Sequence, residues 1–383
     1  MSMADGSSEV ELHPKPTRLV SLDFLRGLVL TMVLVDHVDD LIADYDFFTR
    51  WTLKGLGFSD AAEAFVFLAG FTFGWVYAPR LERDGFWTCQ RRVLVRVVKI
   101  YAAMMLTTVI VAALAWSVSR SSLAFRLPLT ITTPTMFLDA ARDTATFVDP
   151  VWGIAILVVY VCVLPFLPAI LLLAKRSPVA VLGLSGAVYV GTQLLPAMAA
   201  GDAGFNPLAW QVLIVGGVVA GTAAVSRGAA VRLNRALVAV ACLILVAGLI
   251  AAHGLNPPPL SSHADWIRQS VLHSPAFSKT NLGIARIVHF GAVAIVATAT
   301  VRRWPGLAVA RWAQPFVWSG RHSLFLFCLG VILAYLAAMA SAFLPSHLGT
   351  LLFLAADATL IQFAAARVLE QWRLRRHAVL QGR

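Results

Sequence analysis

Charged residues are scarce in this sequence of 383 residues: they make up 13% of it, against 59% for hydrophobic residues. The mean hydropathy is +0.77, a value that soluble domains of this size do not normally reach. A large soluble domain is therefore excluded. Because a membrane-spanning helix needs about 20 apolar residues, we expect an all-α polytopic membrane protein with about ten transmembrane helices joined by short connections.

Cysteine and the motifs of soluble enzymes are also nearly absent. The four cysteines, Cys89, Cys162, Cys242 and Cys328, are dispersed in or beside hydrophobic segments, so neither a disulfide framework nor a zinc site is expected. The sequence has no G-x-S-x-G elbow, HExxH motif, Walker lysine loop or dinucleotide fingerprint. We therefore expect no metal, no covalent serine mechanism and no ATP-driven pump. The polar, acidic stretch before Lys15 lacks the pattern of a cleavable signal peptide.

Hydrophobic runs and their breakers predict the spans near residues 20–41, 59–79, 92–117, 151–174, 178–199, 208–225, 236–253, 282–301, 317–343 and 348–370. The net charge of +11 does not indicate nucleic-acid binding, because the basic residues cluster between these runs, as in cytoplasmic loops. The clusters place both termini in the cytoplasm, with a polar tail at residues 1–18, a single membrane domain at 19–370 and a basic tail at 371–383. The two longer external loops, 118–150 and 254–281, show no sign of a folded domain.

Ionisable residues at membrane depth are costly and usually functional, and the first predicted span holds several. At about 100° per residue, Arg26 and His37 point within about 20° of each other, with Asp23 about 40° to one side. The rise between Arg26 and His37 is about 16 Å, which places His37 near the external end. Asp36 is turned away from His37 by about 100° and is poorly placed to orient it.

The second predicted span brings two carboxylates to the depth of His37. Asp60 and Glu63 share one helical stripe with Gly70 and Gly74, and such small residues allow close approach of another helix. We expect the first two helices to pack with Glu63 facing His37, an arrangement suited to a general base held by a carboxylate. The alternative is an ion pair or hydrogen bond that only ties the two helices together.

Further polar candidates lie at the ends of later helices. Each pair alone is a weak signal, because a histidine at a helix end is more often structural and an interfacial tryptophan is most often an anchor. They are Trp210 with Gln211, Arg286 with His289, and Arg321 with His322.

Five segments together resemble the OpgC family of osmoregulated periplasmic glucan succinyltransferases, which is related to the membrane acyltransferase-3 superfamily. The matching segments are LDFLRGLVLTMVLVDH (Leu22 to His37), GFSDAAEAFVFLAGF (Gly57 to Phe71), FNPLAWQ (Phe205 to Gln211), SKTNLGIARIVHF (Ser278 to Phe290) and SGRHSLFLF (Ser319 to Phe327). They occur in the family's order and run from the first predicted helix to the ninth, so the resemblance covers most of the chain.

The resemblance implies an O-acyltransferase of the bacterial inner membrane that moves a succinyl group from cytoplasmic succinyl-CoA, a co-substrate rather than a bound cofactor, to a sugar hydroxyl of a periplasmic glucan. The expected partners are the glucan acceptor, the acyl-CoA donor and membrane lipids, with no nucleic acid. Acyl transfer to an alcohol needs a base and an oxyanion donor, and we expect His37 to be the base, oriented by Glu63 or, less favourably, Asp60. The expected donor-binding residues are Asp23, Arg26, Arg91, Arg92, Arg321 and His322, and those for the acceptor or the acyl carboxylate are Trp210, Gln211, Lys279, Arg286 and His289.

Two other functions fit the pattern of intramembrane charges. One is acyl transfer with another acyl group or another envelope polysaccharide. The other is a proton-coupled transporter or flippase, in which His, Asp and Arg relay protons or bind substrate. The sequence does not determine the oligomeric state.

Overall fold

The computed structural model describes residues 19–42, 47–119, 127–195, 204–226, 233–253, 274–345 and 348–380, and all regular secondary structure in these ranges is helical. The predicted tail at residues 1–18 and most of the predicted loop at 254–281 lie outside them. The α-helices are α1 (Val20–Ile42), α2 (Ala61–Asp84), α3 (Phe86–Ser117), α4 (Pro134–Ala145), α5 (Ile156–Val163), α6 (Leu167–Arg176), α7 (Pro178–Leu194), α8 (Pro207–Ser226), α9 (Arg235–His253), α11 (Ile284–Arg303), α12 (Gln314–Arg321), α13 (Ser323–Ser341) and α14 (Leu348–Leu380). The short 3-10 helices are η1 (Phe48–Arg50), η2 (Leu53–Leu56), η4 (Leu164–Phe166), η6 (Pro275–Phe277), η7 (Pro305–Val309) and η8 (Arg311–Ala313).

Within the described residues, 7 helical segments are long and apolar enough to cross a membrane, so the chain is a multi-pass, all-α membrane protein as predicted. They are Ala61–Asp84, Phe86–Ser117, Ile156–Arg176, Pro207–Ser226, Ile284–Arg303, Ser323–Ser341 and Leu348–Arg376. Two further predicted spans, α7 and α9, are apolar but shorter. The tenth, α1, carries four aspartates and one arginine in 23 residues. The number ten and the cytoplasmic position of both termini stay predictions.

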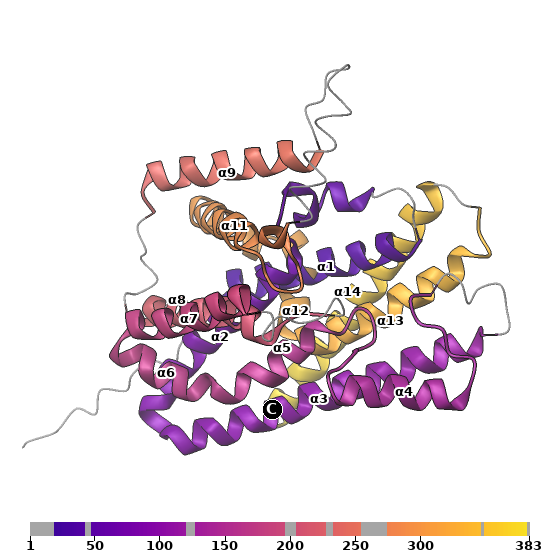
Figure 1. Ribbon diagram of the computed structural model, residues 1–383, viewed down its shortest axis with the longest axis horizontal. Helices are drawn as coiled ribbons and strands as arrows, with labels where there is room; N and C mark the ends of the chain where they lie inside the picture. The colour runs from indigo at the N-terminus through magenta and orange to yellow at the C-terminus, as the bar shows by residue number, and fades with distance from the viewer. Residues whose placement is uncertain are drawn as a thin grey trace, which may run out of the picture.

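Helix α1 lies near the centre of the bundle, with α9 and α11 on one side and α3 and α4 on the other (Figure 1). It packs against α2, α12, α13 and α14. Glycines make the contact with α12 close: a Cβ atom on Gly27 would collide with the backbone of Phe316, and one on Gly320 with the backbone of Asp23. The charged stripe of α1 is therefore surrounded by protein, as ionisable groups at membrane depth require.

Glycines also bring α2 against α8. A Cβ atom on Gly70 or Gly74 would collide with the backbone of α8, and one on Gly217 or Gly221 with the backbone of α2. The prediction of a small-residue stripe on α2 is thus confirmed, but the helix that packs on it is α8 and not α1. Since residues of one stripe face the same way, this packing turns Glu63 away from α1.

Two segments contain more helix than the predicted spans. The segment 118–150, in which no span was predicted, contains α4, which follows Thr133, a side-chain cap that accepts from the amide of Met136, and which has Pro134 in its first turn. Helix α4 packs along α3 (Figure 1). Helix α14, expected to end near residue 370, continues to Leu380. Its added turns bring Arg373 onto the helix, 2.6 Å from Glu370.

Candidate functional site

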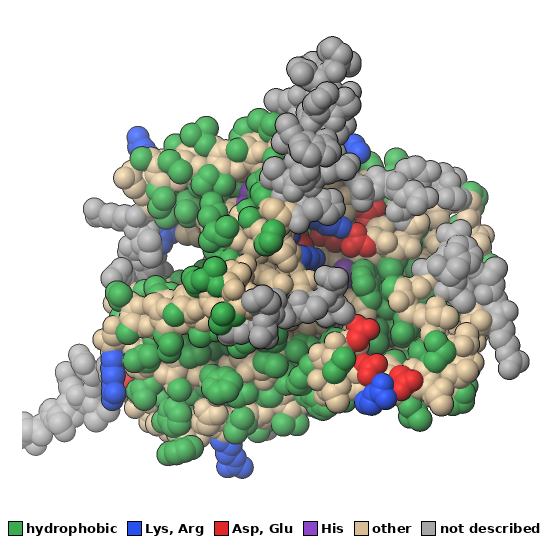
Figure 2. Space-filling view, viewed as in Figure 1, with side chains coloured by type: hydrophobic (Ala, Val, Ile, Leu, Met, Phe, Trp, Pro, Cys, Tyr) green, Lys and Arg blue, Asp and Glu red, His purple; other side chains and the backbone are tan. Residues whose placement is uncertain are grey.

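A cavity of about 660 Å³ opens beside the C-terminal half of α1. Its wall is formed by α1, the segment before α2, the start of α2, α4, the chain leading into α5, and the segments at 204–205 and 279–280. The ionisable side chains that line it are Asp36, His37, Asp40, Lys54, Asp60, Asp139, Asp143, Asp149 and Lys279. The molecular face in Figure 2 is mostly hydrophobic, with acidic and basic side chains gathered near its middle. A polar cavity of this size in an apolar molecule is a candidate substrate site.

His37 projects from α1 into this cavity. Its ring packs against Trp152, with 4.7 Å between ring centroids. The Nδ1 atom is buried and has no hydrogen-bond partner in the described part of the chain. Nε2 is therefore the ring nitrogen that can reach a molecule in the cavity. Gly153, with φ at +90°, makes the turn that holds Trp152 in place, and a side chain there would press on Val331.

The segment between α1 and α2 is fastened to α1 by three aspartates. Thr52 donates a hydrogen bond of 2.7 Å to Asp36, the amide of Thr49 donates to Asp39, and Lys54 lies 2.5 Å from Asp40. The ion pair with Asp40 raises the pKa of Lys54 even though burial opposes it. Asp36 thus contacts Thr52 rather than His37, as its helical angle predicts.

Glu63 does not contact His37, and this corrects the predicted pair. One Glu63 oxygen accepts from Arg286 Nε at 2.6 Å, and the other accepts from the amide of Asp60 at 2.9 Å. Asp60 and Glu63 form a capping box at the start of α2, in which each side chain satisfies an unpaired amide. The carboxylate oxygens that were expected to orient the imidazole are therefore already bonded.

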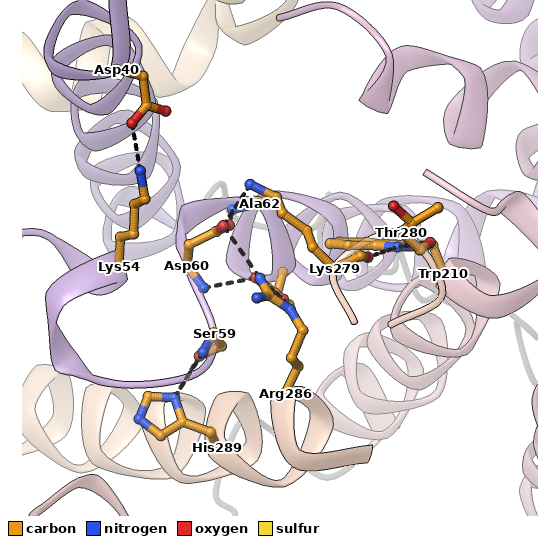
Figure 3. A network of polar contacts seen from close by, with 11 residues as sticks. Asp40, Lys54, Ser59, Asp60, Ala62, Trp210, Lys279, Thr280, Arg286 and His289 are labelled. Carbon is orange, nitrogen blue, oxygen red and sulfur yellow. Dashed lines mark hydrogen bonds and ion pairs between the residues drawn. The ribbon is translucent and has the colours of Figure 1, made fainter. Parts of the chain in front are cut away.

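Asp60 joins Glu63, Lys279 and Arg286 in one polar network. Figure 3 shows Asp60 between Lys279 and Arg286. Its Oδ2 lies 2.7 Å from Lys279 Nζ and 3.3 Å from Arg286, and its Oδ1 accepts from the amide of Ala62 at 2.8 Å. Burial alone would raise the pKa of Asp60, but Lys279 and Arg286 outweigh burial and hold that pKa far below its usual range. Asp60 and Lys279 line the cavity, whereas Glu63 and Arg286 lie behind them.

Three of the residues expected to bind the acceptor or the acyl carboxylate serve the scaffold instead. Trp210 is fully buried, and its Nε1 donates to the carbonyls of Lys279 and Thr280 at 3.0 and 3.1 Å. Gln211 exchanges hydrogen bonds with Ser185 on α7. Nε2 of His289 lies 3.1 Å from the carbonyl oxygen of Leu56. Its Nδ1 lies 2.7 Å from the Ser59 hydroxyl, the contact drawn in Figure 3. Because a carbonyl only accepts, His289 donates from Nε2 and accepts from Ser59 at Nδ1, so it cannot act in the cavity.

The residues expected to bind the donor lie away from the cavity, and most of them are paired. Arg321 lies 3.2 Å from Asp23 and 2.6 Å from Glu370, and His322 lies 3.3 Å from Glu370. Arg26 donates to Ser323. Arg91 and Arg92 are exposed at the start of α3, where Arg92 pairs with Asp84. Arg321 thus contacts both Asp23 and Glu370, and Glu370, which the sequence did not single out, also contacts His322.

Sequence reasoning also missed Trp152, Lys54 and the aspartates of α4. The signal for Lys54 was its place in a polar stretch next to α2. Trp152 and the α4 aspartates gave none, because only the fold carries them to α1. All of them line the cavity with His37.

Comparison with known proteins identifies the family of this chain. Residues 18–374 match the family model described as OpgC protein. No curated protein and no solved structure matches the chain. A match over nearly the whole chain, including every helix that lines the cavity, shows that the chain belongs to the OpgC family, a family of glucan succinyltransferases.

Proposed function

We propose that this protein transfers a succinyl group from succinyl-CoA to a hydroxyl of a periplasmic glucan, with His37 as the general base. The observation that supports this most is the accessible Nε2 of His37 in a cavity of about 660 Å³. Such a volume accommodates a sugar and an acyl group together. Family membership supports the acyl group and the acceptor class.

The reaction needs one proton relay. His37 Nε2 accepts the proton of the sugar hydroxyl as its oxygen attacks the thioester carbonyl carbon, which forms a tetrahedral oxyanion. Collapse of the oxyanion breaks the carbon–sulfur bond, and the CoA thiolate leaves with the proton that His37 returns. The products are the succinyl ester and CoA, and direct transfer needs no acyl-enzyme.

The neighbours of His37 position its ring and anchor the wall of the cavity. The ring is positioned by Trp152 at 4.7 Å rather than by a carboxylate. Asp60 and Glu63 contribute indirectly, because they anchor the start of α2 and hold Lys279 and Arg286 beside the cavity. The indole of Trp210 holds the backbone of Lys279 from the other side.

The CoA moiety would lie towards the end of α1 opposite His37. Its phosphates would meet Arg91, Arg92 and Arg321, and the pantetheine arm would extend along α1 past Arg26 towards His37. Arg91 and Arg92 are exposed, and arginine is well suited to phosphate. This orientation implies an inner-membrane protein with both termini in the cytoplasm, which the basic clusters favour.

The experiment is charge and mass analysis of periplasmic glucans from cells that have the protein, lack it, or carry His37→Ala. We expect succinyl groups to be lost in the second and third samples. Acetyl in place of succinyl would assign the other acyl-transfer function. Glucans that are alike in all three samples would contradict transfer to glucans and favour transport. Succinylated glucans with a well-inserted His37→Ala protein would remove His37 as the base.

A further inference from the structure

Two cations share the same oxygen of Asp60 at the edge of the cavity, and they differ in what they can still bind. Arg286 is 10% exposed, and Lys279 is 50% exposed. Lys279 lines the cavity with His37, whereas Arg286 does not. The family resemblance leaves open which of them meets the far carboxylate of a succinyl group.

Two of the three guanidinium nitrogens of Arg286 are bonded to buried carboxylates. Its Nε and one terminal nitrogen lie 2.6 Å from Glu63, and the same nitrogen lies 3.3 Å from Asp60. Glu63 is completely buried, so moving Arg286 towards a ligand would leave a buried carboxylate without its cation. That change costs several kcal/mol. Arg286 therefore belongs to the fixed layer behind the cavity.

Lys279 has hydrogen-bond donors that Asp60 does not occupy. An ammonium group has three donors, and Asp60 occupies one of them at 2.7 Å. Its position is set from both ends: the carbonyl of Lys279 accepts from Trp210, and its ammonium lies 5.7 Å from the centre of the Phe205 ring, which also lines the cavity. The Lys279 side chain is thus held in place while its ammonium group keeps donors for a ligand.

Asp60 does not depend on Lys279 alone. Its Oδ1 accepts from the amide of Ala62, and its Oδ2 also receives Arg286. Lys279 can therefore turn a donor to a second carboxylate without leaving Asp60 unsatisfied. The rest of the cavity disfavours anionic ligands, since among its described lining residues six are aspartates and two, Lys54 and Lys279, are lysines.

We propose that Lys279 binds the distal carboxylate of a dicarboxylic acyl group and so selects succinyl over uncharged acyl groups. This assignment rests on the proposed acyl transfer. Lys54 is the matched comparison, because it lines the same cavity, is 39% exposed and pairs with one aspartate, Asp40, at 2.5 Å. Lys54 lies on the segment fastened to α1, and within the described ranges no second cation holds Asp40 in the way that Arg286 holds Asp60.

The test is a donor competition. Full-length protein in lipid nanodiscs receives equal amounts of succinyl-CoA and butyryl-CoA, whose acyl chains both have four carbons, with an unsubstituted glucan as acceptor. Product mass gives the ratio of succinyl to butyryl transfer. We expect Lys279→Gln to lower this ratio about 10- to 100-fold, the effect of losing a charge-assisted hydrogen bond. Lys279→Arg should keep most of the preference, and Lys54→Gln should leave the ratio unchanged.

The outcomes separate the selectivity role from the proposed function. Wild-type protein that transfers neither acyl group contradicts the proposed function itself. A wild-type protein that transfers succinyl, with an unchanged ratio in Lys279→Gln, overturns only the role of Lys279. Equal losses with both donors in Lys279→Gln would assign Lys279 to the support of Asp60 and also overturn its role in selection. If Lys54→Gln lowered the ratio as much as Lys279→Gln does, the effect would come from the general charge of the cavity, and the selective role of Lys279 would be overturned as well.

Discussion

Arg286 on α11 donates to Glu63 on α2 across 2.6 Å, although 223 positions separate the two residues in the chain. Both side chains are almost fully buried. The pair fastens α11 to the start of α2, at the point where Asp60 and Lys279 reach the cavity. The wall of the proposed active site is therefore supported by a buried ion pair that does not itself line the cavity.

Breaking that pair from one side should strongly destabilise the protein. Arg286→Met leaves the Glu63 carboxylate buried without its cation, and we expect the free energy of unfolding to fall by about 3 to 5 kcal/mol. The measurement is thermal unfolding in detergent. The double variant Glu63→Gln/Arg286→Met should lose less than the sum of the two single variants, because no unpaired charge remains. Additive losses would show that the two residues do not act as a pair.

The glycine contact between α2 and α8 gives a matched test. A Cβ atom on Gly217 would collide with the backbone at Phe67 and Phe71, whereas one on the adjacent Gly216 meets nothing within 4 Å. Gly217→Ala should lower the free energy of unfolding by about 1 to 3 kcal/mol through overpacking. Gly216→Ala should leave it unchanged or raise it slightly, because alanine favours a helix. Equal melting temperatures for the two variants would contradict the close packing.

Trp152 should matter for the rate because it positions the ring of His37. We expect Trp152→Ala to lower transfer by about 100-fold, the effect of an imidazole displaced by roughly 1 Å. The control is Tyr335→Phe: Tyr335 packs next to Trp152, and its buried hydroxyl has no hydrogen-bond partner in the described part of the chain. Removing that hydroxyl should leave both rate and stability intact. A Trp152→Ala protein with full activity would show that His37 needs no aromatic support.

Asp60 should make stability depend on pH only in acid. Lys279 and Arg286 hold its pKa far below the usual range in the folded protein, whereas the unfolded chain has an ordinary value of about 3.9. The stabilisation is therefore complete above that value and declines as the pH falls below it. The difference in melting temperature between wild type and Asp60→Asn should be constant from about pH 7 to pH 5. It should shrink below about pH 4, and a decrease that begins near neutral pH would contradict the ion pairs.

The sequence was sufficient for the fold class, because hydrophobic runs of helical length with basic breakers depend only on local composition. It also predicted the small-residue stripe on α2, and the family followed from ordered segments along the chain. The helical angles of α1 correctly separated Asp36 from His37, since both residues lie on one rigid helix.

Only the tertiary structure decided which helices those stripes meet. Gly70 packs on α8, and the face of α2 that this contact selects brings Glu63 to Arg286. His37 lies beside Trp152 instead of beside Glu63. Helix periodicity fixes the face on which a residue lies, but it carries no information about the neighbour of that face. The contacts of His37 and Glu63 depend on residues more than a hundred positions away, and only the packing of the whole bundle brings these together.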